Sequence, residues 1–336
     1  MLYQNKTLNE TKFNKFYKNN DLEIGLIGHI DRNIAVADIT NLLDFVREAD
    51  GDFLILAKQD SRLVIITHPL LTKTCYYKLD DVTVSLTPEG ENPINWMVCL
   101  PNTLYTFDNG ELVSMSSCVK WDRREFRNDY DLVFDSFEQG MKTVPKNNTT
   151  LSSGKDTGVI CAYLNRDKLR CVYHTISQSV EHQDILKQRI AKIKSSNGNS
   201  RLMIEKNQDI TDRLIKRVSK QGSICYPRVL SDLQTMADLD KMFSKVVIGS
   251  DILIGTGGDQ LYRFKSTVTN PTDLFIDQLN MVSSWHNITH LNPLMSVKLY
   301  QSFLNVNDTF KKTHCWQEAY MHELGYPYAV DKYHKL

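Results

Sequence analysis

The chain has 336 residues, with 40 Lys and Arg against 40 Asp and Glu, so its formal net charge is zero. This length accommodates two domains of ordinary size. A balanced charge gives no global basic field, which argues against a protein that coats nucleic acid, although a local basic patch stays open. Apolar residues make up 41% of the chain, but no apolar run reaches the roughly 20 residues that span a bilayer. The polar N-terminal residues do not resemble a secretory signal, and we expect a cytoplasmic protein without a membrane partner.

The first third of the chain contains short apolar runs typical of β-strands. We interpret the polar residues 1–23 as a helix or a loose arm. Residues 53–57 and 63–67, separated by a polar turn, predict a β-hairpin. A second hairpin is predicted over 104–115, where Asp108-Asn109-Gly110 tolerates the positive φ of a tight turn. These runs predict a layered, β-rich N-terminal domain over residues 1–125.

The remainder, residues 126–336, is predicted as a second domain in which strands and helices alternate. In chain order we expect a helix over 131–141, a short strand ending at 150–151, a helix starting at Val159, a strand over 170–176, a helix over 183–194, a strand over 246–254 and helices from 271 to the end. This alternation predicts a parallel sheet with a ligand at the carboxyl ends of its strands. We interpret the Lys and Arg residues between Lys187 and Arg201 as a solvated helix face.

Residues 151–158 (LSSGKDTG) form a Ser- and Gly-rich loop between a predicted strand and a predicted helix. Backbone N–H groups at a helix N-terminus, together with Ser and Thr hydroxyls, form a cradle for anions. An acid such as Asp156 inside a phosphate site requires a cation between the two negative groups, and Mg²⁺ is the usual one. The loop therefore indicates a Mg·pyrophosphate or Mg·ATP site. It is not a Walker A loop, because Asp156 follows Lys155.

The same loop resembles the ATP-pyrophosphatase loop of the asparagine synthetase family, S-G-G-x-D-S, with Ser153 in place of the first Gly. Further family signatures follow in the same order. Residues 254–262 (IGTGGDQLY) resemble S-G-E-G-A-D-E-L-F, and Asn292-Pro293-Leu294 and Tyr326-Pro327 followed by Lys335 resemble C-terminal segments of the family. In the N-terminal half, 51–53 (GDF) and 67–77 (THPLLTKTCYY) resemble its G-D-F and R-D-P-L-G-x-K-P-L-Y-Y segments. The resemblance extends from about residue 50 to 335.

This resemblance implies an α/β protein with a known pair of domains. Residues 1–125 would be a degenerate class II glutamine amidotransferase-like domain, an Ntn-hydrolase-like β-rich layered sandwich. Residues 126–336 would be a parallel-sheet, adenine-nucleotide α-hydrolase-like (PP-loop) domain. Leu2 occupies the position of the nucleophilic Cys, and Thr67-His68 replaces the family's Arg-Asp pair. We therefore expect no glutaminase activity, as in the β-lactam synthetase and lasso-peptide cyclase branches.

The resemblance also implies roles for individual residues. The cofactor ATP would contact Ser152, Ser153, Gly154, Asp156, Thr157, Gly255 and Gly257. Asp156 and Asp259 would hold Mg²⁺, and Lys335 would neutralise developing charge in catalysis. Thr256, also a predicted catalytic position, replaces a family Glu and cannot act as a base near neutral pH. The base therefore lies elsewhere, the nucleophile arrives deprotonated, or the enzyme is impaired.

The predicted function is that of an AMP-forming carbon–nitrogen ligase. It would adenylate a carboxylate, release pyrophosphate and transfer the acyl group to an amine or ammonia. The substrates would be small-molecule or peptide carboxylates and amines, whose identities stay open, as does a homodimeric state. The alternative is a catalytically inactive relative that binds or regulates. A third reading, adenylation chemistry on nucleic acid, is disfavoured by the zero net charge.

Overall fold

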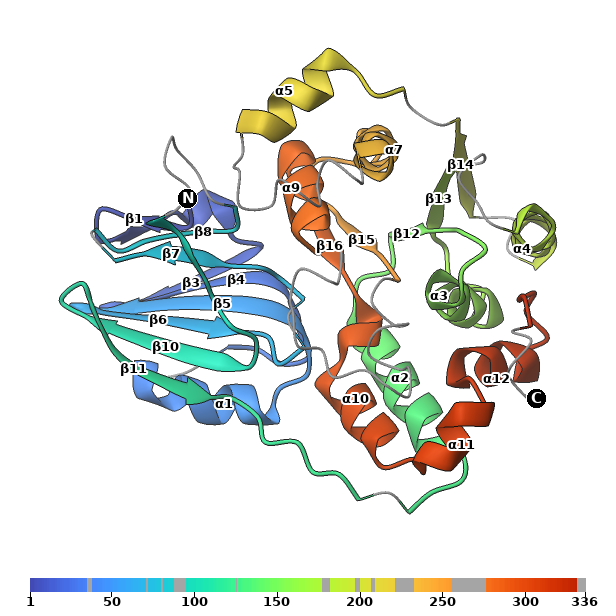
Figure 1. The fold of residues 1–336 in the computed structure, drawn as a ribbon, viewed down its shortest axis with the longest axis horizontal. Helices are drawn as coiled ribbons and strands as arrows, with labels where there is room; N and C mark the ends of the chain where they lie inside the picture. Colours follow the sequence, from blue (N-terminus) through green and yellow to red (C-terminus); the bar gives the residue numbers. More distant parts are fainter. Residues whose placement is uncertain are drawn as a thin grey trace. The chain divides into compact units, whose positions relative to one another are not determined.

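The computed structural model describes most of the chain (Figure 1). The described residues are 1–34, 38–70, 72–79, 81–87, 95–124, 126–176, 182–196, 200–206, 209–220, 233–255 and 276–330. They fall into two compact units. The first takes the described residues within Met1–Lys120, Asp209–Ala237 and Asn270–Trp285, and the second takes those within Trp121–Gln208, Asp238–Thr269 and His286–Leu336. The assignment of residues 1–125 and 126–336 to two functional domains stays a prediction.

The first unit is built on antiparallel β-structure. Its strands are β1 (Tyr3–Gln4), β2 (Thr7–Leu8), β3 (Lys15–Asn19), β4 (Leu22–Ile30), β5 (Gly51–Gln59), β6 (Arg62–Thr67), β7 (Tyr76–Lys78), β8 (Thr83–Ser85), β9 (Met97–Val98), β10 (Thr103–Asp108) and β11 (Glu111–Ser117). Among the described residues they form a smaller sheet of order β2-β1-β8-β7-β9 and a larger sheet of order β11-β10-β6-β5-β4-β3. Helix α1 spans Leu42–Glu48.

Alternating side chains on the larger sheet create a layered core. One face, with Leu54 and Ile65, packs against residues of the smaller sheet such as Tyr77 and Val84. The opposite face packs against α1, so that helix and smaller sheet lie on either side of the larger sheet (Figure 1). Burial of both faces explains why β5 and β6 contain near-continuous apolar runs. The prediction of a layered, β-rich N-terminal domain is therefore confirmed.

Both predicted hairpins are present. β5 and β6 pair antiparallel with Leu56 opposite Ile65, and Asp60 in their turn has a φ of 52°. β10 and β11 are joined through Asn109 and Gly110, whose φ values are 49° and 87°. These positive angles match the turn residues predicted from the sequence.

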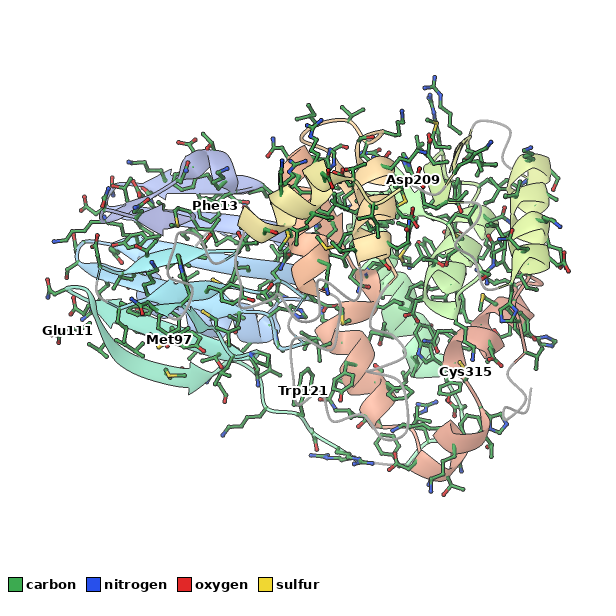
Figure 2. The ribbon with its side chains drawn as sticks, turned by 45° about the horizontal axis from the view of Figure 1, so that its top comes forward. Phe13, Met97, Glu111, Trp121, Asp209 and Cys315 are labelled. Atoms are coloured by element: carbon green, nitrogen blue, oxygen red, sulfur yellow. The ribbon has the colours of Figure 1, made fainter. Side chains whose placement is uncertain are left out.

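The interpretation of residues 1–23 as a helix or loose arm is wrong. This segment contributes β1, β2, β3 and the start of β4. Phe13, labelled in Figure 2, covers Gly25 of β4: a Cβ on Gly25 would lie 2.4 Å from the Phe13 ring. The segment's apolar side chains, including Leu2 and Leu8, complete the core between the sheets. Tertiary burial thus overrides the polar composition of this segment.

The second unit contains a parallel sheet of order β14-β13-β12-β15-β16. Its strands are β12 (Asn148–Thr150), β13 (Val172–Ile176), β14 (Arg201–Glu205), β15 (Asp251–Leu253) and β16 (Thr289–Leu291). Its helices include α2 (Asp131–Thr143), α3 (Lys155–Arg166), α4 (Gln183–Ser196), α10 (Val297–Leu304), α11 (Asp308–Thr313) and α12 (Trp316–Glu323). The chain also forms α5 (Asp212–Lys220), α7 (Leu233–Phe243) and α9 (Ile276–His286). Apolar faces of α2, α3, α10 and α12 share one core with strands β13, β15 and β16. The α/β class and the parallel-sheet domain are confirmed.

Several predicted boundaries in this unit are wrong. Helix α3 begins at Lys155 rather than Val159, because Gly154 in an extended conformation caps the helix directly after the loop. Of the predicted strand 246–254, only Asp251–Leu253 (β15) forms a strand, because a turn with Gly249 at a φ of 77° interrupts the first half of the segment. Strand β16 lies inside the region predicted as wholly helical; its three residues are too few to show a period.

Within the described part of the chain, no helix has both the length and the apolar character needed to cross a membrane.

Candidate functional site

The loop after β12 leads directly into the N-terminus of α3. The first bond inside the helix runs from the Gly158 N–H to the Gly154 carbonyl over 3.0 Å. The amides of residues 155–157 precede this bond, so they point out of the end of the helix. This end carries the positive part of the helix dipole. The loop therefore has the backbone arrangement of an anion cradle at the carboxyl end of a central strand.

The loop hydroxyls hold the loop in shape. The Ser152 hydroxyl accepts the Gly154 N–H at 3.1 Å and shares a hydrogen bond with the Thr157 hydroxyl. The Ser153 hydroxyl is buried and accepts the His182 N–H at 3.2 Å. Side chains that were predicted to contact ATP thus already fix the turn that presents the backbone amides.

Asp156 stands in the first turn of α3, half-buried, and its Oδ1 accepts a hydrogen bond from the Gln317 Nε2 over 3.3 Å. The neighbouring Lys155 forms an ion pair with Glu318, whose side chain is 1% exposed. Gln317 and Glu318 belong to α12, which begins after Cys315 (labelled in Figure 2). The N-terminal turns of α3 and α12 therefore meet at Asp156.

Gly255, just after β15, brings the second sequence motif to the first. A Cβ on Gly255 would lie 2.5 Å from the carbonyl carbon of Asp156 and 2.6 Å from the Thr157 nitrogen. Gly255 therefore packs directly on the Asp156–Thr157 peptide. The parallel pairing of β12 with β15 places the carboxyl ends of these two strands side by side. Only glycine allows an approach this close.

Other predicted site residues lie outside the described residues: Thr256, Gly257, Asp259 and Lys335. The structure thus brings together six of the predicted residues, namely Ser152, Ser153, Gly154, Asp156, Thr157 and Gly255. Among the described residues, no group of three or more His, Cys, Asp or Glu is placed to hold a metal ion. The predicted Mg²⁺ pair of Asp156 and Asp259 stays a prediction.

Arg189 is the residue at this site that the sequence interpretation missed. It was assigned to a solvated helix face, but its side chain is completely buried, and its guanidinium donates to the loop carbonyls of Ser152 and Gly154. A signal was present: Leu186, Arg189 and Ile193 share one face of α4 at helical spacing, and all three are buried.

His174 on β13 lies in a hydrogen-bonded chain that connects β13 to β12 and β12 to β15. Its Nε2 lies 3.2 Å from the Asn148 Oδ1, and the Asn148 Nδ2 donates to the Asp251 carbonyl over 3.0 Å. Burial lowers the pKa of His174 to about 4. The imidazole is therefore neutral in the folded protein at neutral pH.

This buried imidazole predicts acid sensitivity in the second unit. Between pH 6.5 and 4 the unfolded chain binds a proton at His174 that the folded chain does not, so stability falls as pH falls. From pH 6.5 to 5 the loss is about 2 kcal/mol from this residue. Urea unfolding at several pH values tests this, with His174→Gln as the comparison. The variant should have a flatter pH profile below pH 6.5; parallel profiles would contradict the assignment.

The region that resembles a glutaminase site contains a buried ion pair. Leu2 is 3% exposed and donates its N–H to the Val84 carbonyl at 2.7 Å. The Lys73 Nζ lies 2.8 and 2.9 Å from the carboxylate oxygens of Asp52, and both side chains are 2% exposed. Burial lowers the pKa of the nearby His68 to about 4. Asp52, Lys73 and His68 are therefore buried, interacting polar residues of the first unit.

Comparisons with family models and with curated proteins gave no match. Among solved structures, the chain is similar to one titled the structure of the allosteric regulatory enzyme of purine biosynthesis. The TM-score is 0.25 and the identity 8%, over 84% of this chain and 63% of that one. The chain thus spans less than two-thirds of that enzyme's length. A likeness at this level assigns neither a substrate nor a reaction to the chain.

Proposed function

We propose that the protein is an ATP-dependent ligase that adenylates a carboxylate, releases pyrophosphate and transfers the acyl group to an amine or ammonia. The observation that supports this proposal is the packing of Gly255 on the Asp156–Thr157 peptide, which brings the described start of the second motif to the helix end that carries Asp156. Asp259 follows Gly255 by four residues, so the extended chain limits its distance from Gly255 to about 14 Å. Two carboxylates at an anion cradle fit a Mg²⁺ ion bridging to a polyphosphate.

The chain's own residues have separate parts in this proposal. The amides of residues 155–157 would hold the pyrophosphate portion, and Asp156, which accepts a hydrogen bond from Gln317, would hold Mg²⁺. When bound, Mg²⁺ would supply, together with these amides, stabilisation of the charge that develops on the phosphate oxygens. Lys335 is proposed to neutralise charge at the reacting centre. The first unit, with Leu2 buried and Thr67-His68 in place of the family pair, is proposed to be a scaffold without glutaminase activity.

Asp156→Asn tests the proposal through its dependence on magnesium. In calorimetry with Mg·ATP, the variant should bind at least about tenfold more weakly than the parent, because one metal-facing charge is gone. With EDTA present, the variant should bind ATP as tightly as the parent or more tightly, because the Asp156 carboxylate of the parent then repels the phosphates. Asp131→Asn, in the first turn of α2, is the matched control and should leave affinity unchanged.

The outcomes separate the two candidate functions. Equal magnesium dependence in parent and Asp156→Asn would remove Asp156 from the metal site. No binding of Mg·ATP at millimolar concentration would favour the alternative, a catalytically inactive binding or regulatory protein. Pyrophosphate release with a panel of carboxylates then distinguishes a ligase from a protein that only binds nucleotide.

A further inference from the structure

Arg189 holds two distant segments of the second unit together. Its Nη1 lies 2.6 Å from the Ser152 carbonyl oxygen and 2.9 Å from that of Gly154. Its Nε donates to the Pro327 carbonyl over 2.8 Å. A single planar guanidinium thus bonds the loop after β12 on one side and the C-terminal segment on the other, a geometry that a point charge such as Lys cannot reproduce.

These bonds determine which way the loop presents its backbone. In a trans peptide the carbonyl of one residue and the N–H of the next point in opposite directions. Because the carbonyls of Ser152 and Gly154 point at Arg189, the N–H groups of Ser153 and Lys155 point away from it. Arg189 therefore orients the Lys155 N–H, the first donor of the cradle, away from its own guanidinium.

Arg189 is also a buried cation whose recorded partners are neutral. Among the residues that the structure describes, no Asp or Glu forms an ion pair with it; its partners are backbone carbonyls, the Met321 sulfur and the ring of Tyr326. Burial lowers the pKa of Arg189, but arginine remains charged in proteins. α3 makes room for this charge at Gly158, where a Cβ would lie 2.4 Å from the Arg189 Nη2. A buried charge that no described acid neutralises raises the positive potential at the adjacent helix end.

We infer that Arg189 is a positioning residue for the proposed reaction, which orients the anion loop and sets the C-terminal segment that leads to Lys335. This inference rests on the proposed function for the identity of the anion. The linkage between loop and C-terminal segment, however, is a property of the folded protein and is measurable without any ligand.

The test combines hydrogen exchange with binding of magnesium pyrophosphate. In Arg189→Met, amide exchange should rise at least about tenfold at the hydrogen-bonded N–H groups of Gly154 and Gly158 beside the loop and of Tyr326 in the C-terminal segment, with the second half of α3 unchanged. Affinity for magnesium pyrophosphate should fall at least about tenfold, because the amides lose their orientation and the buried charge is gone. Arg189→Lys should recover part of the affinity but not the protection of both segments.

Lys192→Met is the matched control on the same helix. Lys192 donates to the Gly325 carbonyl, and among the described residues no hydrogen bond joins its side chain to the loop. Its removal should loosen the C-terminal segment while leaving loop exchange and pyrophosphate affinity unchanged.

Each result decides between the proposals. Uniformly faster exchange across the core of the second unit in both Arg189 variants would mean that Arg189 only stabilises, and would overturn the inference. Unchanged loop exchange in Arg189→Met would overturn it too, whatever ligand the parent binds. A third result is possible: the parent binds no magnesium pyrophosphate, yet amide exchange rises in both segments of Arg189→Met. This result would contradict the proposed function but would support the positioning role of Arg189.

Discussion

Replacing Lys73 with Met is expected to lower the free energy of unfolding of the first unit by about 3–5 kcal/mol. Lys73 and Asp52 are both 2% exposed, and Nζ lies within 2.9 Å of both carboxylate oxygens. Removing the ammonium leaves the Asp52 carboxylate in a low-dielectric interior without its cation, which costs far more than the pair itself contributes. Hydrogen exchange in β5 and β6 measures the change.

Two comparisons make this prediction specific. The double variant Asp52→Asn/Lys73→Met should be more stable than Lys73→Met alone, because it leaves no uncompensated charge. Lys18→Met, which removes an exposed partner of Glu23, should have little effect. A double variant no more stable than the single one would mean that Lys73 acts through packing rather than charge.

Gly255→Ala should have the largest effect on the candidate site. The added methyl group would lie 2.5–2.6 Å from three atoms of the Asp156–Thr157 peptide. That peptide belongs to the first turn of α3 and cannot rotate away, so either the segment after β15 or the helix must shift. We expect a loss of stability of about 1–3 kcal/mol from overpacking. Binding of Mg·ATP at this helix end, which the proposed function requires, should fall at least about tenfold.

Gly140→Ala is the matched control for this substitution. The nearest atom to a Cβ there is the Ser296 Cβ at 3.9 Å, and Gly140 lies inside α2. Alanine should therefore be neutral or stabilising by up to about 1 kcal/mol. Urea unfolding and calorimetry check both variants. Unchanged stability in Gly255→Ala would show that the two motifs do not pack as tightly as described, and the proposed function would lose its main support.

Where the sequence-based predictions failed, the failures have a common cause. Polar residues 1–23 become strands because Phe13, Leu2 and Leu8 find apolar partners that are distant in sequence. The charge of Arg189 predicts a solvated side chain. The side chain is nevertheless buried, because backbone carbonyls from two other segments accept its hydrogen bonds. The composition of a short segment contains no information on the side chains and carbonyl groups, distant in sequence, that contact it in the folded protein.

The sequence by itself determined the features that depend on local periodicity and turn chemistry. These include both N-terminal hairpins, the strand–loop–helix unit around residues 151–158, and the α/β class. The tertiary structure alone decided that the described residues within 209–237 and 270–285 cluster with those of the first 120 residues, and that Gly255 packs on the peptide after Asp156. The reason is physical: alternation and turn residues act over a few neighbouring positions, whereas close packing and the partners of buried charges depend on which distant segments meet.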